Sequence, residues 1–210
     1  VASIRETESE PLLCRYLLRA AHVFEVGDRL DDSLGFAREA FSIAERFSLC
    51  NSACHAARRL GWAYLDRLST NDVALWTDKG EAWANRTQHP ASIADLSVLR
   101  AEVALAQGSL GEADAFFEKS RLLWGPLKHP RAEAHALALK IALAVEKREE
   151  IVAVDLDEIW RLFRTLANRS MLDLAIGRFA LGLAASGRNT DAARMIHDYL
   201  SMFRRERGPV

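Results

Sequence analysis

The fold can be read from residues 99–120, LRAEVALAQGSLGEADAFFEKS. Apolar residues recur three and four positions apart on both sides of Gly108, which is the spacing of one face of an α-helix. Glycine commonly ends a helix because it adopts conformations that reverse the chain at little cost. Three small residues, Ala101, Ala104 and Ala113, stand where the two helices must approach each other closely. The stretch therefore predicts a helical hairpin.

The same hairpin pattern recurs along the whole chain. The turn glycines Gly27, Gly108 and Gly187 are nearly evenly spaced, two periods of roughly 40 apart, and intermediate turns fall near Leu68 and Glu149. Repeats of about 20 to 50 residues, each unable to bury its apolar face alone, are typical of a solenoid. The expected helix pairs span residues 11–26 and 34–47, 51–68 and 72–87, 91–107 and 110–124, 130–148 and 155–168, and 170–186 and 190–206.

This pattern predicts an all-α fold, an α-solenoid of about five stacked antiparallel helix hairpins that follows a right-handed superhelical curve. Helix should exceed about 70% of residues, with no sheet. The second helix of the fourth hairpin has an ambiguous start, because residues 151–154 could be an extended linker. We expect residues 1–210 to form a single repeat domain. Since residue 1 is Val and not Met, we also expect a piece of a longer protein.

Two short elements resemble the tetratricopeptide repeat. LGWAY at residues 60–64 is similar to its Leu-Gly-x-x-Tyr element, and ADAFF at residues 113–117 to its Ala-x-x-x-Phe element. The period of about 40 exceeds the usual 34 or so of that family. It resembles the longer repeats in the sensor or regulatory halves of large bacterial transcription activators and signalling enzymes. HEAT and armadillo arrays fit the same period.

Composition excludes several classes of protein. Hydrophobic residues make up 50% and charged residues 27%, so the chain can bury a core and is not of disordered composition. The net charge of minus 1 supplies no overall field that would attract nucleic acid or an anionic membrane. No run of apolar residues is long enough to span a bilayer.

Three cysteines are too few for a disulfide framework, which indicates a reducing compartment and predicts the cytoplasm. An excess of 23 arginines over 5 lysines favours a bacterial source.

The sequence contains no motif that predicts catalysis. Cys50, Cys54 and His55 form the single cysteine and histidine cluster, but a structural zinc site needs about four ligands and no second cysteine pair exists. Small apolar cysteines in a helix are the simpler interpretation. Neither a Gly-rich phosphate loop nor a nucleophile elbow is present. We therefore expect no enzyme activity, no metal and no cofactor.

The resemblance implies a binding groove. If Gly61 occupies the position at which the helices of this family pack closely, the first helix of the second hairpin directs a set of side chains towards a concave surface. Other hairpins contribute three more. The expected groove residues are His55, Arg58, Arg59, Trp62, Asp66, Glu102, Lys140 and Arg178. Guanidinium groups bind carboxylates bidentately and Trp supplies contact area, so the groove suits an acidic or carboxylate-ended peptide. Solvated charge, with Trp62 packed between repeats, is an equal alternative.

These features predict a non-enzymatic protein-binding or peptide-binding module. Its expected setting is the regulatory or sensor part of a larger bacterial signalling or transcription-regulating protein. The alternatives are an RNA-binding repeat that stacks bases on its tryptophans, a domain that senses a small molecule, and a cryptic hydrolase. The charge balance gives no support to the RNA alternative.

Overall fold

The structure is a computed structural model that describes residues 9–27, 29–127, 130–147, 149, 161 and 169–206. These residues are 88% helical, form nine α-helices and include no strand. The predicted all-α fold and its high helix content are confirmed. The chain divides into two compact units, Val1–Leu127 and Lys128–Val210. The single-domain organisation and the superhelical curve stay predictions.

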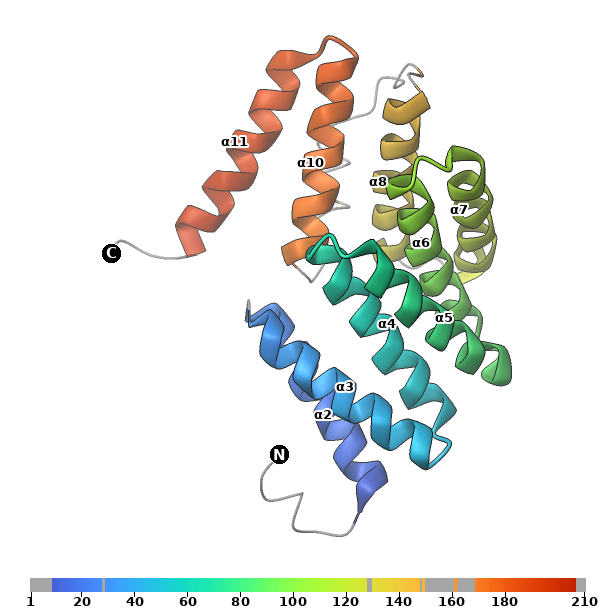
Figure 1. Cartoon of the computed structure of the whole chain (residues 1–210). Helices are drawn as coiled ribbons and strands as arrows, with labels where there is room; N and C mark the ends of the chain where they lie inside the picture. The colour runs from blue at the N-terminus through green and yellow to red at the C-terminus, as the bar shows by residue number, and fades with distance from the viewer. Residues whose placement is uncertain are drawn as a thin grey trace. The chain divides into compact units, whose positions relative to one another are not determined.

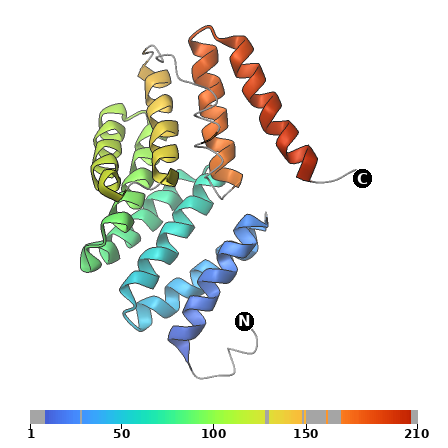
Figure 2. The ribbon, with the colours of Figure 1, turned by 180° about the vertical axis from the view of Figure 1, so that it is seen from behind.

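The first unit contains three successive antiparallel hairpins, α2 (Glu10–Val26) with α3 (Leu30–Arg46), α4 (Cys50–Asp66) with α5 (Thr70–Thr87), and α6 (Pro90–Ala106) with α7 (Leu110–Trp124) (Figure 1). Each helix packs against the next along the chain, and the first helices of neighbouring hairpins also contact one another. Figure 2 shows the same stack of hairpins from behind. The short 3-10 helix η1 (Gly125–Leu127) follows α7.

The hairpins of this unit have a strict period. Successive helices begin at evenly spaced positions, which are Glu10, Leu30, Cys50, Thr70, Pro90 and Leu110. The predicted period of the hairpins is therefore confirmed in this unit. The four turns between α3 and α7 share one left-handed residue two positions before the next helix, and its φ is 53° at Ser48, 55° at Leu68, 53° at Gln88 and 75° at Gly108. Gly27 differs from the expectation because its φ is −81°, an ordinary value for any residue.

The turn at Leu68 carries a correctable strain. This side chain is 86% exposed and its φ of 55° lies in the left-handed region, which costs an L-residue about 1 to 2 kcal/mol. Glycine loses about 0.5 to 1 kcal/mol more entropy on folding. We therefore expect Leu68→Gly to raise the free energy of unfolding, measured in urea, by about 0.5 to 1 kcal/mol. Gly108→Ala is the reverse control and should lower it by about 1 kcal/mol. A lower free energy of unfolding in Leu68→Gly would show that the left-handed backbone of Leu68 is not strained.

Small residues let the hairpins approach one another. Ala101, Ala104 and Ala113 are buried, as expected from their position in the hairpin. A Cβ added to Gly61 on α4 would lie 2.7 Å from Cδ1 of Leu99 on α6. The glycine therefore marks a close contact between the second and third hairpins. This contact fixes the rotation of α4 and so decides which of its side chains remain accessible.

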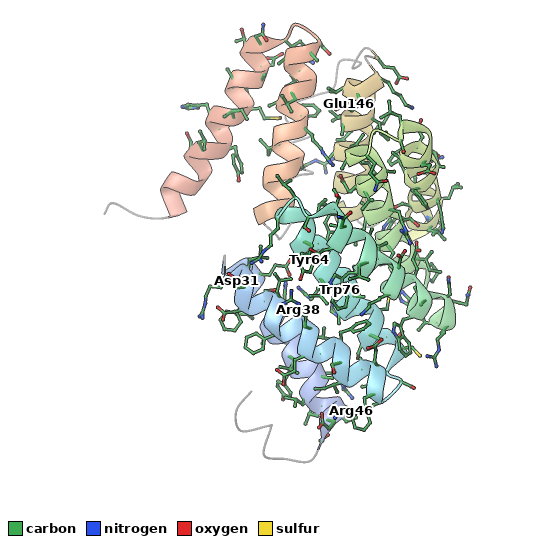
Figure 3. The ribbon with its side chains drawn as sticks, viewed as in Figure 1. Asp31, Arg38, Arg46, Tyr64, Trp76 and Glu146 are labelled. Carbon is green, nitrogen blue, oxygen red and sulfur yellow. The ribbon has the colours of Figure 1, made fainter. Side chains whose placement is uncertain are left out.

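Charged pairs join neighbouring helices around this core. The arginines involved bond carboxylates or a tyrosine hydroxyl on a different helix. Arg38 on α3 donates to the hydroxyl of Tyr64 on α4, and Figure 3 shows both side chains between these helices. The pairs between charged groups are Arg46 with Glu10, Arg58 with Asp95, Arg59 with Glu25, Arg67 with Asp31, and Arg100 with Asp78 and Glu81.

The second unit contains α8 (Pro130–Lys147), α10 (Arg169–Ala185) and α11 (Asn189–Glu206). Helix α10 packs against both of the others, with Phe179 and Met195 in their shared core. The turn before α11 uses Gly187 at a φ of 76°, as predicted for a turn glycine. Apart from residue 161, the expected helix over residues 155–168 lies outside the described residues. None of the helices in the described ranges is long and apolar enough to cross a membrane.

Candidate functional site

An open hollow of about 570 Å³ lies between α2 and α4. Its volume falls within the range of about 300 to 1,000 Å³ that is usual for ligand sites. The walls combine basic, polar and apolar side chains from the first helices of two neighbouring hairpins. The lining residues, called the α2–α4 hollow below, are Arg15, Leu18, Arg19, His22, Val23, Asn51, Ser52, His55 and Arg59.

The hollow is basic. Three arginines and two histidines line it, and no carboxylate does so among the described residues that form its wall. Arg15 and Arg19 are exposed and have no hydrogen-bond or ion-pair partner in the described part of the chain. Every other arginine that the structure describes in residues 9–127 contacts a carboxylate, a tyrosine hydroxyl or an aromatic ring. Two guanidinium groups beside the hollow are therefore available to an anionic ligand.

The remaining basic groups of the hollow are held in place. Arg59 donates to the carboxylate of Glu25, and both side chains are largely buried, with 15% and 13% exposed. The same carboxylate lies 3.9 Å from Nδ1 of His22. Burial lowers the pKa of His55 to about 3, and the charges of Arg58, Arg59 and His22 add to this effect. His55 is therefore neutral at pH 7, and the positive charge of the hollow comes mainly from its arginines.

The structure brings together two of the residues predicted for the groove. His55 and Arg59 line the same hollow. Arg58 instead bonds Asp95 on α6, and Trp62 is half-buried against the core of the first unit.

None of the other predicted residues is among the described residues that line the hollow. Asp66 is the last residue of α4, and its side chain is outside the described part of the structure. Glu102 is only 4% exposed within α6. Lys140 is exposed on α8 and Arg178 is half-buried on α10, both in the second unit. The binding role of this set of residues stays a prediction.

The sequence prediction missed the α2 half of the hollow, although the repeat contains a signal for it. The positions one hairpin period before His55 and Arg59 in the sequence are occupied by Arg15 and Arg19. The same step takes Trp62 to His22, which lines the hollow although Trp62 does not. The positions of His55 and Arg59 therefore face the hollow in both hairpins, whereas the position of Trp62 does so only on α2.

The thiols near the hollow are not activated nucleophiles. Burial raises the pKa of Cys14 and of Cys54 above the usual value for a thiol. Cys14 also donates to the carbonyl oxygen of Ala40 at 3.4 Å. Within the described residues, no three His, Cys, Asp or Glu side chains are placed to hold a metal ion. The arginines of the hollow are the groups suited to recognition of an anionic ligand.

A smaller hollow of about 270 Å³ lies among α5, α6 and α7. Its charged groups are Glu81, Arg100 and Lys119. Arg100 already donates to Glu81 at 2.8 Å and to Asp78. The hydrogen bond to Glu81 raises the pKa of Arg100. Because its charges largely satisfy one another, this second hollow is less suited to an external ion than the α2–α4 hollow.

Comparison with known proteins adds no family assignment. The sequence matches no protein-family model, and no curated protein is significantly similar to it.

Proposed function

We propose that this chain is a non-enzymatic, tetratricopeptide-like binding module that holds an acidic segment of a partner protein in the α2–α4 hollow. The observation that carries this proposal is the pair of exposed arginines, Arg15 and Arg19, which lack a partner in the described residues, whereas each of the other described arginines of the unit contacts a carboxylate, a tyrosine hydroxyl or an aromatic ring. A guanidinium group binds a carboxylate through two parallel, charge-assisted hydrogen bonds. Glu and Asp side chains or a chain terminus would supply such groups.

We further propose a regulatory or sensor setting in a larger bacterial signalling protein. The support is the strict period of the hairpins, which resembles that of the longer repeats in such proteins. The three cysteines, which are free thiols, are compatible with the reducing conditions of the cytoplasm. The full open reading frame of the gene tests this setting, because an attached DNA-binding or catalytic domain would support it directly.

The binding proposal is tested with a fluorescein-labelled, glutamate-rich peptide and the full chain, by fluorescence anisotropy. We expect Arg15→Glu with Arg19→Glu to weaken binding by about thirtyfold or more, as expected when interface anchors are removed. The matched control is Arg29→Glu with Arg121→Glu, which makes the same change in net charge. These two arginines are exposed and each pairs with a carboxylate close by in the chain at 2.8 Å, so their replacement should change affinity by less than about threefold.

Two outcomes would overturn this proposal. Equal weakening by both double variants would mean that net charge and not the hollow attracts the peptide. Tighter binding of a generic single-stranded RNA, with affinity that falls steeply as salt rises, would replace the protein partner by nucleic acid.

A further inference from the structure

Helix α2 carries an exposed stripe beside the hollow. Leu12, Tyr16 and Val23 are 40%, 41% and 66% exposed, and Arg19 is exposed between them. Their spacings of four, three and four place all four side chains on one side of the helix. The opposite side of α2 packs into the core of the unit through Leu13, Cys14, Leu17 and Ala21. The stripe is thus the accessible face of a helix whose opposite face is buried in the core of the unit.

We propose, on the basis of the proposed function, that the acidic segment bound here is an amphipathic α-helix lying along this stripe. Its apolar side chains would contact Leu12, Tyr16 and Val23, and its carboxylates would pair with Arg15 and Arg19. The stripe and the α2–α4 hollow share Arg19 and Val23, so the two form one continuous surface. The hollow supplies the charge of this surface and the stripe supplies its apolar area.

The spacing of the stripe favours a helical partner over an extended one. Alternating steps of four and three form the seam along which two helices pack side by side. The stripe runs from Leu12 to Val23, about three turns or about 16 Å of helix. A helix of about 12 to 18 residues could follow it over its full length. An extended strand presents one face at every second position, a spacing of about 6.6 Å, and does not match this repeat.

Electrostatic repulsion argues against a second copy of the chain as the partner that binds this stripe. Two copies paired through this stripe would bring Arg15 and Arg19 of one copy close to the same residues of the other. The described residues of the stripe and hollow include no carboxylate to offset this repulsion, because Glu25 lies outside both and bonds Arg59. An acidic helix avoids the repulsion and satisfies both guanidinium groups.

The experiment compares two labelled peptides of about 18 residues with identical Glu and Leu composition. In the patterned peptide, Leu recurs at spacings of four and three, whereas in the permuted peptide Leu is distributed around the helix. Binding to the full chain is measured by anisotropy, and peptide helicity by circular dichroism. We expect the patterned peptide to bind at least about tenfold more tightly and to become helical in the complex.

Variants identify the surface. Tyr16→Ala with Val23→Ala should reduce the affinity for the patterned peptide to that of the permuted one. Leu75→Ala with Leu122→Ala removes comparable exposed side chains, 48% and 67% exposed, from other helices of the same unit and should leave it unchanged. Because all four side chains are substantially exposed, each variant should keep its helical signal.

The failures can be told apart. Equal affinity for the two peptides would overturn the helical partner and leave the acidic partner standing. Binding of neither peptide would overturn both proposals. A dimer that forms in analytical ultracentrifugation and is lost in the Tyr16→Ala, Val23→Ala variant would assign the stripe to a second copy of the chain and overturn the acidic helix.

Discussion

Leu99→Ala is expected to lower the free energy of unfolding of the first unit by about 2 to 5 kcal/mol, because it opens a cavity at a fully buried position. Gly61→Val should lower it by about 1 to 3 kcal/mol through overpacking, since a Cβ at this glycine would lie 2.7 Å from Leu99 Cδ1. The first change removes three carbon atoms and the second adds three. The double variant should therefore be more stable than additivity predicts, by at least about 1 kcal/mol.

Urea unfolding of the full chain, followed by circular dichroism, measures all members of this cycle. Gly35→Val provides the control because Gly35 is exposed on α3 and a Cβ added there would meet no atom within 4 Å. Combined with Leu99→Ala, this control should be additive within about 0.5 kcal/mol. If the Gly61 cycle is also additive, the close contact between α4 and α6 does not exist, and the rotation of α4 that positions His55 and Arg59 loses its explanation.

The hairpins could be predicted because their signals are local. Apolar spacing predicts the helices, and Pro90 and Pro130 open α6 and α8, where a missing N–H breaks no helical hydrogen bond. The glycine signal was only a partial guide to the turns. Gly108 and Gly187 have the expected left-handed conformation, but the same turn position is occupied by Leu68 and by other residues that rarely adopt it. The hairpins whose turns lack glycine could therefore be placed only from the period between the glycines, and not from the residue type in each turn.

The site was only partly predictable because accessibility depends on contacts between hairpins. Arg58 and Arg59 are neighbours on α4, and their charge and helix position gave no reason to separate them. Arg58 is satisfied by Asp95 of the following hairpin, and Arg59 by Glu25 of the preceding one. Only Arg59 lines the hollow. The helix phase predicted that His55 and Arg59 lie on one surface, whereas the ion pair that each arginine forms depends on the neighbouring hairpin.

Replacing Trp62 distinguishes two interpretations of this residue, which either packs between hairpins or contacts a bound partner. The structure places this half-buried side chain against the core of the first unit, and it does not line the hollow. We expect Trp62→Ala to lower the free energy of unfolding by about 2 to 4 kcal/mol, somewhat less than the loss of a fully buried Trp. The control Leu122→Ala removes a side chain that is 67% exposed and should cost less than about 0.5 kcal/mol.

The same Trp62→Ala variant also tests the position of the site. At a temperature where it remains folded, its affinity for the glutamate-rich peptide should stay within about threefold of the wild-type value, because the arginines that bind carboxylates are intact. A folded variant of unchanged stability that binds the peptide about thirtyfold more weakly would instead make Trp62 an interface anchor. That result would move the binding surface from the α2–α4 hollow along α4 towards the groove predicted from the sequence. Loss of stability with retained affinity would keep the site at Arg15 and Arg19, because the tryptophan would then contribute only to the packing between hairpins.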